Sequence, residues 1–149
     1  MTDTPFHSTP EFRALSWQAQ WLFFNALKDG PSRCGVVDVW PKRYAELSAA
    51  VTEQNIIEWA REIAAGGVAL YDEATDELML PGYMADVTPA NNARKVIAVV
   101  NAIKAVRSPE IAAAALQELR QLRANNPDAA VWNDPRAAAL LEDLGATAE

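Results

Sequence analysis

Residues 56–84, IIEWAREIAAGGVALYDEATDELMLPGYM, decide the fold. Apolar residues recur every three or four positions in the first part of this stretch, which is typical of a helix with one buried face. Two glycines end that pattern, and two apolar segments, about 67–71 and 77–80, then flank the polar turn DEATDE. A short polar turn between two apolar segments indicates a β-hairpin. We therefore expect a helix that is followed directly by a two-stranded hairpin.

The helix before the hairpin has recognisable ends. Thr52 is a suitable N-cap and Gly66 a suitable stop. Helical spacing divides its side chains into two faces. Those expected to be buried are Ile56, Ile57, Ala60, Ile63 and Ala64. Those expected to face outward are Gln54, Glu58, Arg61 and Ala65.

Three elements are predicted upstream of this helix. The first is a helix over residues 16–29, with Ser16 as its N-cap and Gly30 after its end. The second is a short strand over 35–39, in the β-rich stretch CGVVDVW. Pro41 then stands at the first position of another helix, where its missing N–H costs nothing. The apolar face of that helix consists of Tyr44, Leu47 and Val51.

Downstream of the hairpin, two helices carry the same start signal. Thr88 and Pro89 are expected to begin the first, and Ser108 and Pro109 the second. One tight turn joins them, which predicts an αα-hairpin. Asp134 and Pro135 open a last short helix. The apolar stripes of the two long helices are Val96, Val99, Val100, Ile103 and Val106, and Ile111, Ala115, Leu119 and Leu122. The predicted organisation is an N-terminal arm (1–14), a domain (15–86), the αα-hairpin (87–123) and an acidic tail with a short helix (124–149).

The net charge of −7 is unevenly distributed. Residues 1–86 carry six basic and thirteen acidic side chains, and residues 124–149 one basic and five acidic. Residues 87–123 carry six basic and two acidic side chains, a net charge of +4. Only this middle block has the sign that attracts phosphate, although solvated helix faces would give the same pattern.

Several function classes find no support in the composition. No apolar run is long enough for a membrane span, and the N-terminus does not look like a signal peptide. The single Cys34 cannot form an intramolecular disulfide, which fits a reducing cytoplasm. His7 is the only histidine, so we expect no catalytic residues and no zinc site. The turn DEATDE lacks the calcium-loop pattern, and we expect no metal and no cofactor.

The order helix, short strand, helix, tight turn, helix, hairpin is that of a winged helix-turn-helix. The sequence resembles the small winged-helix proteins of actinobacterial phages, akin to the N-terminal domains of phage replication initiators or replisome organisers. The resemblance covers roughly residues 8–122 and is carried by FRALSWQAQWLFFNALKD, GVVDVWPKRYAELSAAV, IIEWAREIAAGGVALYDEATDELMLPGYM and NAIKAVRSPEIAAAALQELRQL.

This resemblance implies a mainly α (α+β) fold, a winged helix-turn-helix followed by an αα-hairpin and a short C-terminal helix. The β-hairpin would be the wing, and the helix before it would read DNA bases. It further implies a non-catalytic DNA-binding protein that acts in replication initiation or transcriptional control, in the bacterial cytoplasm. The candidate DNA-binding residues are Arg33, Lys42, Arg43, Gln54, Arg61, Arg94, Lys95, Lys104 and Arg107, and Arg120 and Arg123 extend the set.

The sequence departs from that pattern in charge. The helix that should read bases carries Glu53, Glu58 and Glu62 against one basic residue, Arg61, and the hairpin turn is wholly acidic. A pair between Glu58 and Arg61 on a solvated face is the simplest interpretation, although Glu58 could also accept a bond from a cytosine amino group.

An alternative hypothesis is an acidic protein-interaction module that docks on a host or phage nucleic-acid enzyme, even imitating DNA. Homodimerisation through the αα-hairpin is compatible with both hypotheses. The candidate protein-interaction residues are Glu58, Asp72, Glu73, Asp76 and Glu77.

Overall fold

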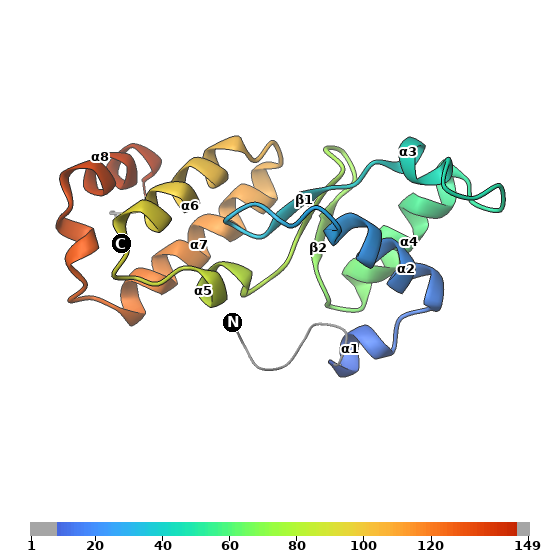
Figure 1. Ribbon diagram of the computed structural model, residues 1–149, viewed down its shortest axis with the longest axis horizontal. Coiled ribbons are helices and arrows are strands. Elements are labelled where there is room, and N and C mark those ends of the chain that lie inside the picture. The colour runs from blue at the N-terminus through green and yellow to red at the C-terminus, as the bar shows by residue number, and fades with distance from the viewer. Residues whose placement is uncertain (1–8, 146–149) are drawn as a thin grey trace. The chain divides into compact units, whose positions relative to one another are not determined.

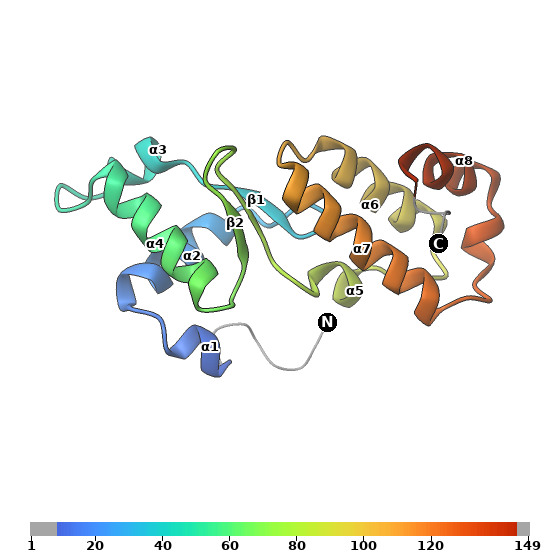
Figure 2. The same cartoon turned by 180° about the vertical axis from the view of Figure 1, so that it is seen from behind.

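The computed structural model describes residues 9–145 (Figures 1 and 2). Most of the predicted arm, with His7, and the last four residues of the predicted tail lie outside this range. The described chain is mainly helical with a small antiparallel sheet, as an α+β class predicts. It divides into two compact units: residues 9–31 with 36–81, and residues 32–35 with 82–145. Within residues 9–145, no helix has both the length and the apolar character that a bilayer span requires.

The first unit contains four helices and three strands. The predicted helices at 16–29 and after Thr52, and the strand at 35–39, are confirmed. The helices are α1 (Pro10–Arg13), α2 (Trp17–Leu27), α3 (Pro41–Ala45) and α4 (Glu53–Ala65). The strands are β1 (Val36–Asp38), β2 (Leu70–Asp72) and β3 (Glu77–Met79). Helix α1 belongs to the predicted arm, and its Phe12 is buried against the ring of Phe23 in α2, 5.2 Å between centroids.

The start of α2 is tied to α4. The Ser16 hydroxyl accepts a hydrogen bond from the Ala19 N–H at 3.2 Å, which is the predicted N-cap. Glu62 of α4 accepts two further bonds from Ser16, one from its N–H at 2.6 Å and one from its hydroxyl at 2.8 Å. The two helices also share a core formed by Ala19, Leu22, Phe23, Ile56, Ala60 and Ile63.

The caps of α4 follow the sequence prediction. Thr52 and Asn55 form a reciprocal capping box, with the Thr52 hydroxyl accepting from the Asn55 N–H at 3.1 Å. Gly66 is the C-cap. Ile56, Ala60 and Ile63 are buried as predicted, whereas Ile57 and Ala64 are only half-buried. The outward face is confirmed by the exposure of Gln54, Glu58, Arg61 and Ala65.

The sheet has the order β1-β3-β2, and both pairings are antiparallel. The first hairpin strand was predicted from residue 67, but β2 begins at Leu70. Gly67 takes a left-handed conformation, with φ +77, and the Val68 N–H donates to the Ile63 carbonyl at 3.2 Å. These residues therefore complete the end of α4, and the strand starts only after them.

Helix α3 is shorter than its apolar pattern indicated. It spans one turn and ends at Ala45, so Leu47 falls beyond the helix. Tyr44 is buried as predicted, whereas Leu47 is exposed. Pro41 does occupy the first turn.

The second unit is built from helices. The starts predicted at Ser108 and Asp134 are confirmed, because both side chains accept hydrogen bonds from N–H groups of the first turn. The helices are α5 (Tyr83–Val87), α6 (Ala93–Ala105), α7 (Pro109–Asn125), the 3₁₀ helix η2 (Ala130–Asn133) and α8 (Pro135–Leu144). The stripes of α6 and α7 are buried, except that Val106 is half-buried and lies just past α6.

The predicted start at Thr88 and Pro89 is wrong. Helix α6 begins at Ala93, and the side chain of its N-cap Asn92 accepts from the Lys95 N–H at 3.2 Å. The Asn92 N–H donates to the Pro89 carbonyl at 3.2 Å, which closes a turn before the helix. Thr88 is buried and ends α5, a helix that was not predicted.

The segment predicted as an acidic tail packs into the second unit as far as it is described. Val131, Trp132, Ala137 and Leu141 are buried, and α8 lies beside α6 in both ribbon views (Figures 1 and 2). The Trp132 indole N–H donates to the Asn126 carbonyl at 2.6 Å. Residues 126–145 therefore contribute buried side chains to the core of this unit.

Candidate nucleic-acid interface

The exposed face of α4 is the surface on which base contacts were predicted. Gln54, Glu58 and Arg61 project from it, opposite the buried Ile56, Ala60 and Ile63. Glu62 does not belong to this face, because both of its carboxylate oxygens accept hydrogen bonds from Ser16. The carboxylates that remain exposed on α4 are Glu53 and Glu58. The helix is therefore less acidic toward solvent than its sequence indicates.

Arg61 is paired with the turn between β2 and β3. Its Nε donates to one carboxylate oxygen of Glu73 at 2.9 Å and its Nη2 to the other at 2.5 Å. The hydrogen bond from the guanidinium lowers the pKa of Glu73 and raises the pKa of Arg61. The hydrogen-bonding partner of Arg61 is therefore Glu73, and not Glu58 as predicted. A candidate DNA-binding residue and a candidate protein-interaction residue neutralise each other.

The other carboxylates of the turn are also held by nearby groups. Asp72 accepts from the Ala74 N–H at 2.9 Å, and Asp76 accepts from the Tyr71 hydroxyl at 2.9 Å. Burial, and then the bond to Asp76, raises the pKa of Tyr71. Glu77 was predicted at the exposed tip, but it lies inside β3 and is buried. Within residues 9–145, no three His, Cys, Asp or Glu side chains are grouped so that they could hold a metal ion.

Glu77 sits in an acidic row across the sheet. The register places it opposite Asp38 of β1 and Asp72 of β2. Residues that pair directly in a sheet project from the same face, so the three side chains share one face of the sheet. This juxtaposition could not be read from the sequence, because it depends on the order of the strands.

Lys42 and Arg43 are the exposed cations at the start of α3. Neither forms an ion pair with any residue in the described part of the chain. No ion pair therefore neutralises their charges within the described residues. They lie in the same unit as the exposed face of α4.

The remaining candidates belong to the second unit. Arg94 and Lys95 are in the first turn of α6, and Arg107 and Arg33 are exposed in loops. Lys104 was a candidate for phosphate, but it pairs with Asp143 at 2.5 Å. Two further arginines also make internal contacts: Arg120 donates to the Gly145 carbonyl at 2.9 Å, and Arg123 lies 5.6 Å from the ring centroid of Trp132.

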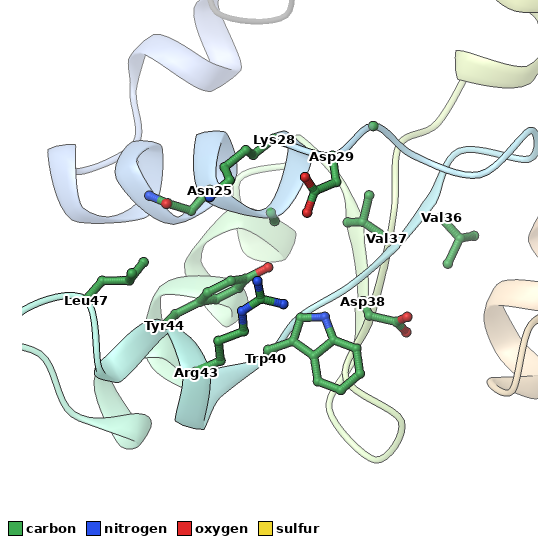
Figure 3. Close-up of a pocket in the computed structure, with 12 residues that line it drawn as sticks. Asn25, Lys28, Asp29, Val36, Val37, Asp38, Trp40, Arg43, Tyr44 and Leu47 are labelled. Carbon is green, nitrogen blue, oxygen red and sulfur yellow. The ribbon is translucent and has the colours of Figure 1, made fainter.

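Sequence reasoning missed a hollow of about 260 Å³ in the first unit (Figure 3). It is formed by the end of α2, by β1 and by α3 with the residues around it. Trp40 stands at its edge with half of its surface exposed, 52%. Burial raises the pKa of Tyr44 in the hollow, and Asp29 and Asp38 add to that rise while Arg43 opposes it. An exposed tryptophan directly before a proline and two cations, WPKR, was the available signal.

Comparison of the chain with models of protein families, with curated proteins and with solved structures found no match.

Proposed function

We propose that this protein binds duplex DNA as a winged helix-turn-helix and acts, without catalysis, in phage replication initiation or transcriptional control. The observation that carries the proposal is the pairing of two features in one unit. Helix α4 exposes Gln54 and Glu58 on a solvent-facing stripe, and the α3 start exposes the unpaired Lys42 and Arg43. Side chains that can bond to base edges thus lie on α4, and cations that can contact phosphate lie on the preceding helix, α3.

The order of elements supports this reading. The succession α2, β1, α3, α4, β2, β3 is that of a winged helix, with α3 and α4 as the helix-turn-helix and the β2–β3 hairpin as the wing. In a helix-turn-helix the second helix enters the major groove while the first lies across the backbone. This assigns base reading to α4 and phosphate contact to α3. Helices α6 and α7 would be the αα-hairpin extension.

The side chains on α4 fit base edges selectively. A glutamine such as Gln54 can bond twice to adenine, and a carboxylate such as Glu58 can accept from the amino group of cytosine. Because Glu73 neutralises Arg61, the wing itself offers little to phosphate. Affinity then depends on Lys42 and Arg43, and on the cations of the second unit.

Two charge-reversal pairs test the proposal. Lys42→Glu with Arg43→Glu alters the first unit, and Arg94→Glu with Lys95→Glu alters the second. The control, Arg13→Glu with Arg136→Glu, changes the net charge equally at exposed positions outside the candidate set. We expect loss of duplex retardation in the first pair and normal retardation in the control. Equal loss in the control would show that only net charge matters and would contradict the assignment to α3.

A second candidate function is docking on a basic protein partner. It is favoured by the exposed Glu53 and Glu58, which no hydrogen bond or ion pair within residues 9–145 occupies. Such a surface could pair with the groove of a nucleic-acid enzyme and imitate DNA. Purification from host lysate on the immobilised protein tests this function. Recovery of no partner, together with firm duplex binding, would exclude it.

Self-association is compatible with either function. Two copies could pack through the α6 and α7 pair. Light scattering over a range of concentrations tests this, and a monomer at every concentration would contradict it.

A further inference from the structure

Two aromatic side chains on α2 are exposed, and a third, Trp40, is exposed at the hollow. Trp17 is 72% exposed and Phe24 is 53% exposed. Trp17, Phe24 and Lys28 are seven and four residues apart, so they lie on one face of the helix region. Lys28 also lines the hollow, where Trp40 is exposed as well. The Phe24 ring packs edge-on against Phe12, 5.5 Å between centroids, and keeps its outer half exposed. Several exposed aromatic groups in one unit favour a binding surface over chance exposure of single residues.

The hollow combines three kinds of chemistry. Lys28 and Arg43 supply positive charge, and Asp29 and the Tyr44 hydroxyl supply hydrogen-bonding groups. In Figure 3, Arg43 extends beside Tyr44, and Asp29 faces them from the end of α2. Trp40 adds a flat indole at the rim. Within residues 9–145, neither Lys28 nor Arg43 has an ion-pair partner.

These groups match an unpaired nucleotide better than an apolar peptide side chain. A nucleobase offers a flat face for stacking and an edge that carries donors and acceptors, and its backbone offers phosphate. An apolar side chain in the hollow would remove water from Asp29, Arg43 and Tyr44 without replacing its hydrogen bonds, which is costly. The aromatic residues on α2 then provide stacking positions for neighbouring bases.

We propose that the surface formed by Trp17, Phe24, Lys28, Trp40 and Arg43 binds single-stranded nucleic acid and holds one unstacked base in the hollow. This inference deepens the proposed function, since it rests on nucleic acid as the partner of the first unit. It uses a surface other than the exposed face of α4. Arg43 belongs both to this surface and to the proposed duplex contact at α3, so duplex and opened strands would compete for it.

A carboxylate in the hollow implies a preference among bases. Asp29 lines the hollow, and a carboxylate oxygen accepts hydrogen bonds. Cytosine, adenine and guanine carry exocyclic amino groups with two donor hydrogens, whereas an unpaired thymine donates only through its ring N3–H. Oligo(dC) is therefore expected to bind more tightly than oligo(dT).

Fluorescence anisotropy with labelled oligo(dC) and oligo(dT) of about 12 nucleotides tests the inference on the full chain. A duplex of similar length is titrated in parallel, and unlabelled dCMP serves as a competitor. Trp40→Ala is the test variant, and Leu70→Ala is the matched control, since Leu70 is an exposed apolar residue outside the hollow. Lys28→Met is a second test variant that keeps most of the side-chain stem and removes the charge. Circular dichroism checks that each variant is folded.

We expect Trp40→Ala to weaken oligo(dC) binding by about 10-fold, the usual consequence of losing one stacked base. Leu70→Ala should bind like the wild type, and Lys28→Met should make the salt dependence shallower by about 0.7 in the log–log slope. Duplex affinity should change little in Trp40→Ala. Preference for oligo(dC) over oligo(dT) would support the role of the carboxylate.

Three results would overturn the inference. The first is oligo(dC) affinity that Trp40→Ala and Lys28→Met leave unchanged. The second is equal affinity for dCMP and oligo(dC). The hollow alone would then account for binding, and Trp17 and Phe24 would not contact the strand. The third is that neither oligonucleotide binds, and the occupant of the hollow would then be a polypeptide. If duplex binding persists in these cases, the proposed function stands, and if no DNA of either form binds, both fail.

Discussion

Arg61 of α4 and Glu73 of the β2–β3 turn form an ion pair through two hydrogen bonds, at 2.9 and 2.5 Å. Arg61 is the single basic residue of α4. The pair therefore links the helix to the hairpin and removes the one positive charge that α4 could offer to phosphate. Both side chains are about half exposed, so the pair contributes little to the stability of the unit. Its main effect is on the charge of the surface.

Glu73→Gln should strengthen duplex binding, because it releases the charge of Arg61. One additional phosphate contact would steepen the plot of log affinity against log salt by about 0.9. Anisotropy titrations at several salt concentrations measure both quantities. Glu142→Gln, on the exposed surface of α8, removes the same charge and is the control. An unchanged slope in Glu73→Gln would show that α4 does not approach the DNA backbone.

Glu62→Gln should destabilise the first unit. Ser16 donates to both carboxylate oxygens of Glu62, and glutamine replaces one of these oxygens with an amide nitrogen that cannot accept a hydrogen bond. Leaving one donor unpaired costs about 1–3 kcal/mol. Urea unfolding measures the free energy, and Glu58→Gln, on the exposed face of the same helix, should stay within about 0.5 kcal/mol of wild type. Equal stability of the two variants would contradict the capping role of Glu62.

Trp132→Ala should destabilise the second unit by about 3–5 kcal/mol, the usual cost of truncating a buried tryptophan. The indole packs at the end of α7, donates to the Asn126 carbonyl and lies under Arg123. Thermal unfolding monitored by circular dichroism measures the effect. A loss below about 1 kcal/mol, as is typical of exposed positions, would mean that residues 126–145 are an appendage.

Glu118 predicts a pH dependence in the second unit. Burial raises its pKa above 4.5, and the hydrogen bond from the Gly82 N–H only partly opposes this. The folded chain then holds the proton to a higher pH than the unfolded chain does. Glu118 therefore makes the free energy of unfolding fall as the pH rises from about 4.5 through the folded pKa.

Glu118→Gln removes that contribution. The free energy of unfolding of the variant minus that of the wild type should therefore increase between pH 4.5 and pH 7. Urea unfolding at the two pH values measures the shift. A difference that stays constant, or moves toward the wild type, would contradict the assignment.

Much of the fold was predictable because its signals are local. Ser16, Ser108 and Asp134 cap helices through bonds to N–H groups two or three residues away, so their sequence neighbourhood suffices. The stripe of α7 repeats at helical spacing and is buried throughout. Thr88 and Pro89 carry an equally good local signal and fail, because Thr88 is instead the C-cap of α5 and Asn92 caps α6.

The candidate site was less predictable because its contacts are not local. Glu73 is twelve positions from Arg61, and Ser16 is forty-six from Glu62, so neither partner follows from spacing along a helix. The burial of Glu77 depends on β3 being the central strand. The hollow needs α2, β1 and α3 in place together, so Trp40 alone could not reveal it.

The most direct measurement is the affinity of the unmodified protein for a duplex of about 20 base pairs, titrated between about 50 and 200 mM salt. Lys42 and Arg43 on α3 should produce clear binding at low salt that weakens steeply as salt rises. The same titration on Lys42→Glu with Arg43→Glu should show no binding. Absence of retardation of any duplex by the wild type at the lowest salt would contradict the proposal that this chain is a DNA-binding protein.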